Sequence, residues 1–406
     1  MRLRSSILSI ASRRDATTWP RLSETRIGFM HHTYAFKPLP LSFILVLAAL
    51  ISRSVGEVPP NKSHSDVSYY VTADGNHEPV RAAADWSKRR EQILAGMQEA
   101  MGPLPRPDKP VPLDVQILEE HQEEGYIRRK IAYHTDRPNT RTHAWLLLPL
   151  PLGEGRGEGA LKNPIARLPA VLCLHQTTPR GKDSPVGLSD RPTLHYAKEL
   201  AKRGYVTLSP DYPSFGDSKD YDFDADDYVS GSMKAIYDNT RAIDLLQSLP
   251  EVDGRRIGCI GHSLGGHNGL FTAVFDDRIK AVVTSCGFTS AHKYKGGDLQ
   301  GWTSPRYMPL VATRYHNSPD EIPFDFPEIL AAIAPRAVFV SAPLHDDNFE
   351  ISGVRDCLTA AAPIFKLLGA PDKLRAVHPD CAHDFLEPER RQSYAFLDEY
   401  LKSESK

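Results

Sequence analysis

A serine set between two glycines is the strongest chemical signal in the chain. The pentapeptide Gly261-His262-Ser263-Leu264-Gly265 follows a short apolar stretch with strand character and precedes an apolar stretch with helix character. A serine on a sharp turn between a strand and a helix has its hydroxyl exposed at the top of a sheet. The turn strains the serine backbone, and a side chain at either glycine would collide with the neighbouring strand or helix. We therefore predict that Ser263 is a nucleophile.

The strand, turn and helix around Ser263 resemble the nucleophile elbow of the α/β-hydrolase superfamily. From about Trp86 to its C-terminus the chain most resembles bacterial esterases of the dienelactone hydrolase and acetyl xylan esterase branch. The resemblance implies an α/β fold, in which a mostly parallel central sheet carries helices on both faces and follows an N-terminal helical and antiparallel extension. It also implies that the catalytic acid and then the histidine base come after the serine in the chain.

A serine hydroxyl is a weak nucleophile at neutral pH and needs a histidine base that a carboxylate orients. His383 lies in the loop before the last expected helix, where the superfamily carries its base, and His378 at the end of the preceding strand is the alternative. Asp346 follows an earlier strand, where the superfamily carries its acid, and the adjacent Asp347 is the alternative. We predict a catalytic triad of Ser263, Asp346 and His383.

An oxyanion hole requires two backbone N–H groups aimed at the developing negative charge. Leu264, directly after the nucleophile, is expected to supply one of them. The second is expected from the loop after the strand over residues 168–174, where His175-Gln176 stands in place of the His-Gly of many relatives. By this resemblance the donor is Thr177, with Gln176 as the alternative.

Alternation of apolar and polar residues predicts antiparallel strands over residues 111–119, 126–134 and 142–150. Expected strands and helices alternate from residue 168 onward, which favours parallel pairing with helices on both faces. The expected later strands cover residues 168–174, 205–209, 256–260, 279–286, 336–341 and 374–377, and the expected helices cover residues 85–101, 193–203, 232–249, 354–368 and 388–401. We expect residues 57–110 to form an N-terminal arm with a packing helix, and residues 111–406 to form the catalytic domain.

The connection over residues 288–335 is long and rich in aromatic residues. Long ordered connections often form a lid or wall over a site. Trp302, Arg306 and Tyr307 are therefore candidate substrate-binding residues. The alternative is that they only anchor the connection on the sheet.

Residues 1–56 are expected to lie outside the fold. The apolar run from Leu41 to Ile51 is too short to cross a bilayer, which takes roughly 20 helical residues. Small residues before Glu57 offer a cleavage site for signal peptidase. We predict that translation begins at Met30 and that the chain starts with a secretory signal peptide. The mature protein is then expected to be secreted or periplasmic, without stable membrane insertion. The glycine- and glutamate-rich residues 153–159 are expected to form a solvated loop.

Composition limits the partners of the protein. The 406 residues carry a formal net charge of -2 and have no long run of one sign, so nothing indicates nucleic-acid binding. The five cysteines show no disulfide or metal spacing, and neither Cys-x-x-Cys nor His-Glu-x-x-His occurs. We expect no metal and no organic cofactor, and a small-molecule or carbohydrate ester as substrate.

These features favour a serine esterase that works through an acyl-enzyme, with acetyl or other small acyl groups on a polysaccharide as substrates by resemblance. A prolyl oligopeptidase-type peptidase is one alternative, although no repeated propeller region precedes the catalytic stretch. A non-catalytic binding protein on the same fold is another. Labelling by a fluorophosphonate probe separates the catalyst from the binder, because labelling requires an activated serine.

Overall fold

The computed structural model describes residues 64–150 and 167–402. The predicted signal peptide, the start at Met30 and the loop over residues 153–159 lie outside the described residues. The described residues belong to one compact unit. Within the part of the chain that the structure describes, no helix combines the length and apolar character needed to span a membrane.

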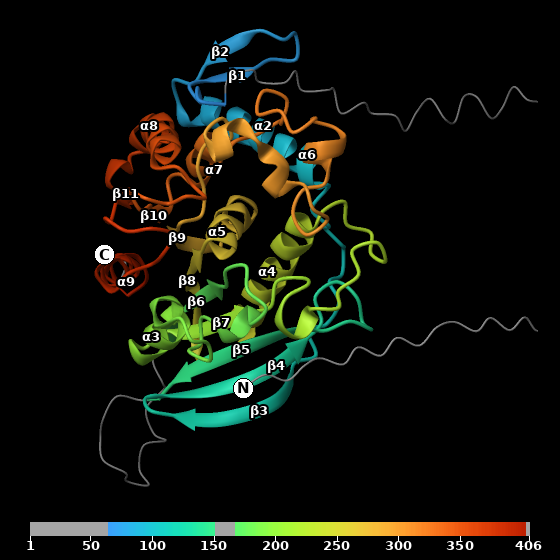
Figure 1. Cartoon of the computed structure of the whole chain (residues 1–406), viewed down its shortest axis with the longest axis vertical. Helices are drawn as coiled ribbons and strands as arrows, with labels where there is room; N and C mark the ends of the chain where they lie inside the picture. Colours follow the sequence, from blue (N-terminus) through green and yellow to red (C-terminus); the bar gives the residue numbers. More distant parts are fainter. Residues whose placement is uncertain (1–63, 151–166, 403–406) are drawn as a thin grey trace, which may run out of the picture. The chain divides into compact units, whose positions relative to one another are not determined.

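The central sheet has nine strands in the order β11-β10-β9-β8-β6-β7-β5-β4-β3 (Figure 1). The pairs from β11 to β7 are parallel, and those from β7 through β5 and β4 to β3 are antiparallel. This confirms the predicted fold class. The strands are β3 (Gln116–Glu123), β4 (Tyr126–Tyr133), β5 (Thr142–Pro149), β6 (Leu168–Leu174), β7 (Val206–Pro210), β8 (Val252–His262), β9 (Ile279–Ser285), β10 (Ala337–Ser341) and β11 (Leu374–Val377).

Helices cover both faces of the sheet, as expected. The short helix α3 (Tyr196–Lys202) and the C-terminal helix α9 (Glu387–Leu401) pack on one face. Opposite them lie α2 (Ala83–Met101), α4 (Gly231–Ser248), α5 (Leu264–Phe275), α7 (Phe326–Ile333) and α8 (Ile351–Leu367). The parallel strands β7, β9 and β10 are almost entirely buried, because helices cover both of their faces.

Several predicted elements differ from the structure. The strand expected over residues 256–260 is longer and extends over Val252–His262 as β8. The strand expected over residues 111–119 begins only at Gln116, because Asp114 adopts a positive φ of 42° that interrupts an extended chain. The helix expected over residues 193–203 is split: a 3₁₀ turn at Pro192–Leu194 ends at His195, and α3 starts at Tyr196. The arm before α2 contains a hairpin that the sequence analysis did not predict, with strands β1 (Tyr69–Val71) and β2 (His77–Pro79).

The connection over residues 288–335 contains two different parts. Its first part has 3₁₀ turns at Tyr294–Gly297 and Leu299–Trp302 and the short helix α6 (Leu310–Thr313). Its second part is α7, in which every residue is buried. Helix α7 contacts α5 and α8 and is therefore the crossover helix between β9 and β10 rather than an appended lid.

Two glycines permit the close approach of α5 to the ends of the neighbouring strands. A Cβ at Gly265 would stand 2.0 Å from the carbonyl oxygen of Leu174 at the end of β6. A Cβ at Gly261 would stand 2.2 Å from the carbonyl oxygen of Gly265. Neither distance is compatible with a side chain, so both glycines are required by packing, as the sequence pattern predicts.

We predict that Gly265→Ala lowers the free energy of unfolding by about 3 kcal/mol, because the added methyl group meets backbone that cannot move aside. Gly269→Ala in the same helix is the matched control. Its Cβ would meet the Sγ atom of Cys259 at 3.0 Å and the Cδ1 atom of Leu174 at 3.8 Å, both of them side-chain atoms, so we expect a change within about 1 kcal/mol. Equilibrium denaturation in urea measures both values. Equal effects of the two variants would contradict the packing argument.

Candidate active site

Ser263 stands at the sharp turn between β8 and α5. Its backbone has φ 54° and ψ -117°, a combination that is strained for a residue with a side chain. The Ser263 N–H donates to the carbonyl oxygen of Ser285 at 2.8 Å, which ties the turn to the end of β9. The side chain is partly exposed. The structure thus gives Ser263 the conformation that the Gly-x-Ser-x-Gly pattern predicts.

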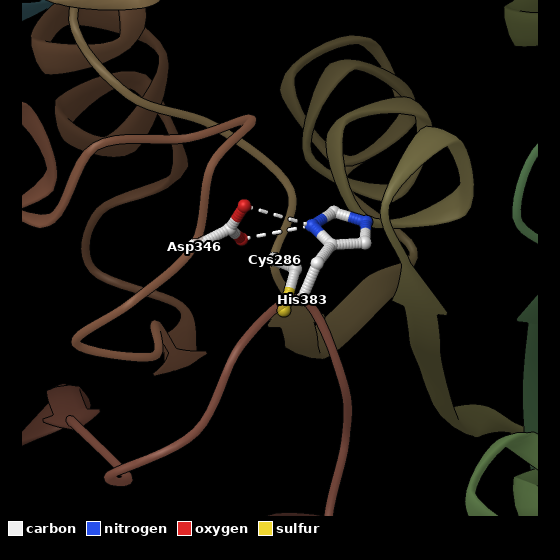
Figure 2. Close-up of side chains that lie close together, drawn as sticks. All are labelled: Cys286, Asp346 and His383. Atoms are coloured by element: carbon white, nitrogen blue, oxygen red, sulfur yellow. Dashed lines mark hydrogen bonds and ion pairs between the residues drawn. The ribbon is translucent and has the colours of Figure 1, made fainter.

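A buried carboxylate holds the imidazole of His383 (Figure 2). The Nδ1 atom of His383 lies 3.0 Å from Oδ1 and 2.9 Å from Oδ2 of Asp346. The Asp346 side chain is 1% exposed, whereas that of His383 is 28% exposed. Asp346 also accepts hydrogen bonds from the N–H groups of Asn348 and Phe349, at 2.8 and 3.0 Å.

The pKa of Asp346 is lowered in this setting. Burial alone would raise it, but the hydrogen bond and charge of His383 and the N–H donors of Asn348 and Phe349 outweigh burial. Asp346 is therefore ionised at neutral pH. An ionised carboxylate only accepts hydrogen bonds, so Nδ1 of His383 carries the proton and Nε2 keeps its lone pair.

The alternative acid and base have other contacts. Asp347 is exposed, and its carbonyl oxygen accepts a hydrogen bond from Lys295. The His378 Nδ1 atom lies 3.0 Å from the carbonyl oxygen of Ala342. The geometry therefore favours Asp346 and His383, which the structure brings together, over Asp347 and His378.

His383 lies beside the elbow. Its ring centroid is 4.9 Å from that of His262, the residue before Ser263. No hydrogen bond joins Ser263 to His383 among residues 64–150 and 167–402. In hydrolases without substrate this contact is often long and tightens only in the substrate complex.

The structure leaves free the backbone groups that are candidates for the oxyanion hole. Leu264 is the first residue of α5, so its N–H has no acceptor within the helix. In the described part of the chain the N–H groups of Thr177 and Gln176 also have no hydrogen-bond acceptor. The side-chain amide of Gln176 instead donates to Ser184 Oγ at 2.9 Å.

Three buried polar contacts hold the loop that carries Thr177. The Nε2 atom of His175 accepts from the N–H of Tyr212 at 3.0 Å, and its Nδ1 donates to the Gln176 carbonyl at 2.7 Å. Burial lowers the pKa of His175, so the ring is neutral and can both accept and donate. The Lys182 Nζ atom lies 2.8 Å from the Asp211 carboxylate, and both side chains are almost completely buried.

The three candidate substrate-binding residues occupy different positions. Tyr307 and Arg306 are partly exposed. The Tyr307 hydroxyl lies 3.2 Å from Oγ1 of Thr177, and the Arg306 Nε donates to Ser214 Oγ at 2.7 Å. Trp302 is only 7% exposed. Its ring lies between those of other aromatic residues, which favours the anchoring role for Trp302; the neighbours are His267, Tyr294, Tyr307, Phe326 and Phe349.

His267 packs against Trp302 and Tyr307, the aromatic wall of the site, although it was not among the residues predicted from the sequence. It lies one helical turn after Ser263, 5% exposed, with its ring centroid 4.8 Å from that of Trp302. Neither ring nitrogen has a hydrogen-bond partner of good geometry among the described residues. Burial lowers the pKa of His267 to about 3, so the ring is neutral. The signal that identifies it is its spacing of four residues from the nucleophile on the same helix.

Comparisons with known proteins identify hydrolases and esterases among the relatives of this chain. A family model described as glucuronyl esterase of fungi matches residues 216–369. YtaP of Bacillus subtilis, a hydrolase by name, is 30% identical over 246 residues, which cover 57% of this chain and 79% of YtaP. The 4-O-methyl-glucuronoyl methylesterase of Hypocrea jecorina is 27% identical over 47% of this chain, and this chain covers 45% of that enzyme.

Solved structures show the same fold. A glucuronoyl esterase from Solibacter usitatus superposes with a TM-score of 0.64 and 19% identity, covering 84% of this chain and 98% of that one. Together with the strand order and the elbow, these relatives place the protein in the α/β-hydrolase superfamily, among the serine enzymes that hydrolyse carboxylic esters. Within that superfamily the chain belongs to the family that includes YtaP.

We predict that Asp346→Asn reduces kcat by roughly 10⁴, because an amide at this position no longer favours the Nδ1–H form of His383. Asp347→Asn is the matched control and should leave kcat within about twofold, since no contact joins the Asp347 carboxylate to His383 in the described residues. Steady-state hydrolysis of p-nitrophenyl acetate measures both. A large loss in Asp347→Asn with near-normal turnover in Asp346→Asn would transfer the role to Asp347.

Proposed function

We propose that Ser263, His383 and Asp346 hydrolyse carboxylic esters through an acyl-enzyme. Ser263 Oγ attacks the ester carbonyl while Nε2 of His383 takes the hydroxyl proton. The same nitrogen then gives the proton to the leaving alcohol, and a covalent ester on Ser263 remains. Water, activated by His383 in the same way, releases the acid and restores the serine.

The observation that carries this proposal is the contact between His383 Nδ1 and both oxygens of Asp346, beside a strained serine. The contact fixes the tautomer that leaves Nε2 free to accept a proton. It also stabilises the imidazolium formed during the attack, because the carboxylate stays ionised. Asp346 therefore orients and stabilises His383, and His383 takes the proton from Ser263.

The N–H groups of Leu264 and Thr177 are proposed to bind the oxyanion. Leu264 is at the N-terminus of α5, where the helix dipole favours negative charge. Thr177 is supported by the buried contacts that hold its loop, which fix donor direction before the substrate arrives. Removing one donor of this kind lowers kcat by roughly 10² to 10³.

The proposed substrate is a carboxylic ester carried by a carbohydrate, with a uronic acid on the acyl side. Support comes from the glucuronyl esterase family model and from relatives named 4-O-methyl-glucuronoyl methylesterase. The wall of the site offers suitable groups. Tyr307 and Arg306 are partly exposed, and the Tyr307 hydroxyl lies 3.2 Å from Oγ1 of Thr177. Such groups hydrogen-bond to sugar hydroxyls.

An acetyl ester on a polysaccharide is the second candidate, in which the sugar lies on the alcohol side. It is supported by the resemblance to the acetyl xylan esterase branch. A structure described as an acetyl xylan esterase from Bacteroides fragilis has a similar fold, with a TM-score of 0.53 and 21% identity.

The two candidates predict opposite substrate preferences. We expect kcat/KM for methyl glucuronate to exceed that for acetylated xylose by at least tenfold, because the wall groups then bind the acyl part next to Ser263. Release of methanol and of acetate measures the two reactions, with Ser263→Ala as the blank. The reverse preference would support the acetyl esterase, and release equal to the blank for every ester, including p-nitrophenyl acetate, would contradict the proposed function.

Tyr307→Phe tests the link between the wall and the oxyanion loop. We predict a loss in kcat of about three- to tenfold, which corresponds to one hydrogen bond of roughly 1 kcal/mol. Tyr294→Phe is the control, because Tyr294 also packs against Trp302 but makes no hydrogen bond to Thr177 among the described residues. A loss of the same size in both variants, or a lowered melting temperature in Tyr307→Phe alone, would mean that the hydroxyl stabilises the fold instead.

Export through a cleaved signal peptide is also proposed, on the strength of the apolar run from Leu41 to Ile51. N-terminal sequencing of the mature protein tests it. Cleavage before Glu57 is the expected result, and a mature N-terminus upstream of residue 40 would contradict export.

A further inference from the structure

Three residues that are far apart in the sequence place nitrogen, oxygen and sulfur donors together beside the elbow. They are Cys286, directly after β9, Asp346, in the loop after β10, and His383, in the loop before α9 (Figure 2). One donor atom from each lies within 4.8 Å of the other two. Cys286 and Asp346 are buried, and His383 is partly exposed.

We propose that Cys286, Asp346 and His383 bind a thiophilic divalent cation, Zn²⁺ or Cd²⁺, and that this binding inhibits the enzyme. Imidazole, carboxylate and thiolate are the three ligand types that zinc takes in proteins. Zinc–ligand bonds of about 2.0 to 2.3 Å place the donor atoms of a tetrahedral site roughly 3.3 to 3.8 Å apart. To bind the ion, each of the three donor atoms would therefore move by no more than about 1 Å.

The charges of the three ligands suit a buried ion. A thiolate and a carboxylate carry two negative charges, which balance the divalent cation. Water entering from the exposed side of His383 completes the tetrahedron. A neutral complex avoids the penalty of burying net charge.

Binding would block the proposed mechanism through the tautomer of His383. The cation takes the Nδ1 lone pair, so the imidazole proton moves from Nδ1 to Nε2, while the thiol of Cys286 releases its proton to solvent. The Nε2 atom then carries hydrogen and has no lone pair to accept the Ser263 proton. Inhibition needs no covalent change and is reversed when a chelator removes the ion. This step rests on the proposed function, whereas the binding of the ion does not.

Cys381 provides a matched control for the thiol. It lies in the same loop as His383, is partly exposed and is a free cysteine, but it is outside the three-donor cluster. We expect micromolar Zn²⁺ to inhibit the parent enzyme and Cys381→Ser equally, with full recovery in EDTA. Cys286→Ser should need at least tenfold more Zn²⁺, because a serine hydroxyl is a poor zinc ligand. Each variant is compared with itself without zinc, so a change in basal turnover does not affect the result.

Titration with Co²⁺ measures the binding independently of activity. The parent protein should show a thiolate-to-cobalt charge-transfer band that saturates at one equivalent, and Cys286→Ser should lack it. No such band in the parent protein would overturn the proposed site, even if Cys286→Ser failed to fold. Equal Zn²⁺ inhibition of the parent and Cys286→Ser would also overturn it, because surface histidines would then account for the effect. A parent that shows the band but hydrolyses no ester would retain the metal site and refute the proposed function alone.

Discussion

The close approach of α5 to the end of β6 is the constraint on which the active site depends. Gly265 touches the carbonyl of Leu174 in a way that excludes any side chain, and this contact forces the chain to turn sharply at Ser263. The turn has three consequences. It presents the serine hydroxyl, it places the free N–H of Leu264 at the start of a helix, and it brings the end of β6 with the Thr177 loop to the same edge of the sheet.

Parallel strand register then brings the acid and base to this edge. Strands β8, β9, β10 and β11 run side by side in parallel, so their carboxyl ends lie next to one another. Asp346 follows β10 and His383 follows β11, which explains how residues 37 positions apart form one hydrogen-bonded pair. The same register brings Cys286, at the end of β9, beside that pair. The proposed catalytic pair and the proposed metal site therefore have one structural origin.

Much of this arrangement could be predicted, because short patterns of neighbouring residues determine it. Residues 168–174 and 374–377 were predicted with the bounds that β6 and β11 have, and the elbow glycines were assigned their packing role. The bounds predicted for the edge strand β3 were wrong, because nearly all of its residues are exposed. Its apolar and polar residues therefore do not alternate between a buried and an exposed face. Helix α7 was missed although its start has a clear signal, in which Asp325 and Glu328 form a capping box.

Other features required three-dimensional information. The choice of Asp346 over Asp347 depends on which carboxylate faces His383, and adjacent residues cannot be separated by spacing alone. The burial of Trp302 results from five aromatic neighbours, two of which, His267 and Phe349, lie outside the connection over residues 288–335. The cluster of Cys286, Asp346 and His383 has no sequence signature, because its members belong to three separate loops.

The most direct test of the account is to trap the acyl-enzyme. The protein is mixed rapidly with p-nitrophenyl acetate, quenched in acid and digested, and the peptides are analysed by mass spectrometry. We expect one acetylated peptide, with the acetyl group on Ser263, that is absent from Ser263→Ala and disappears on longer incubation. Acetylation at another residue, or turnover that persists in Ser263→Ala, would contradict the claim that this serine is the nucleophile.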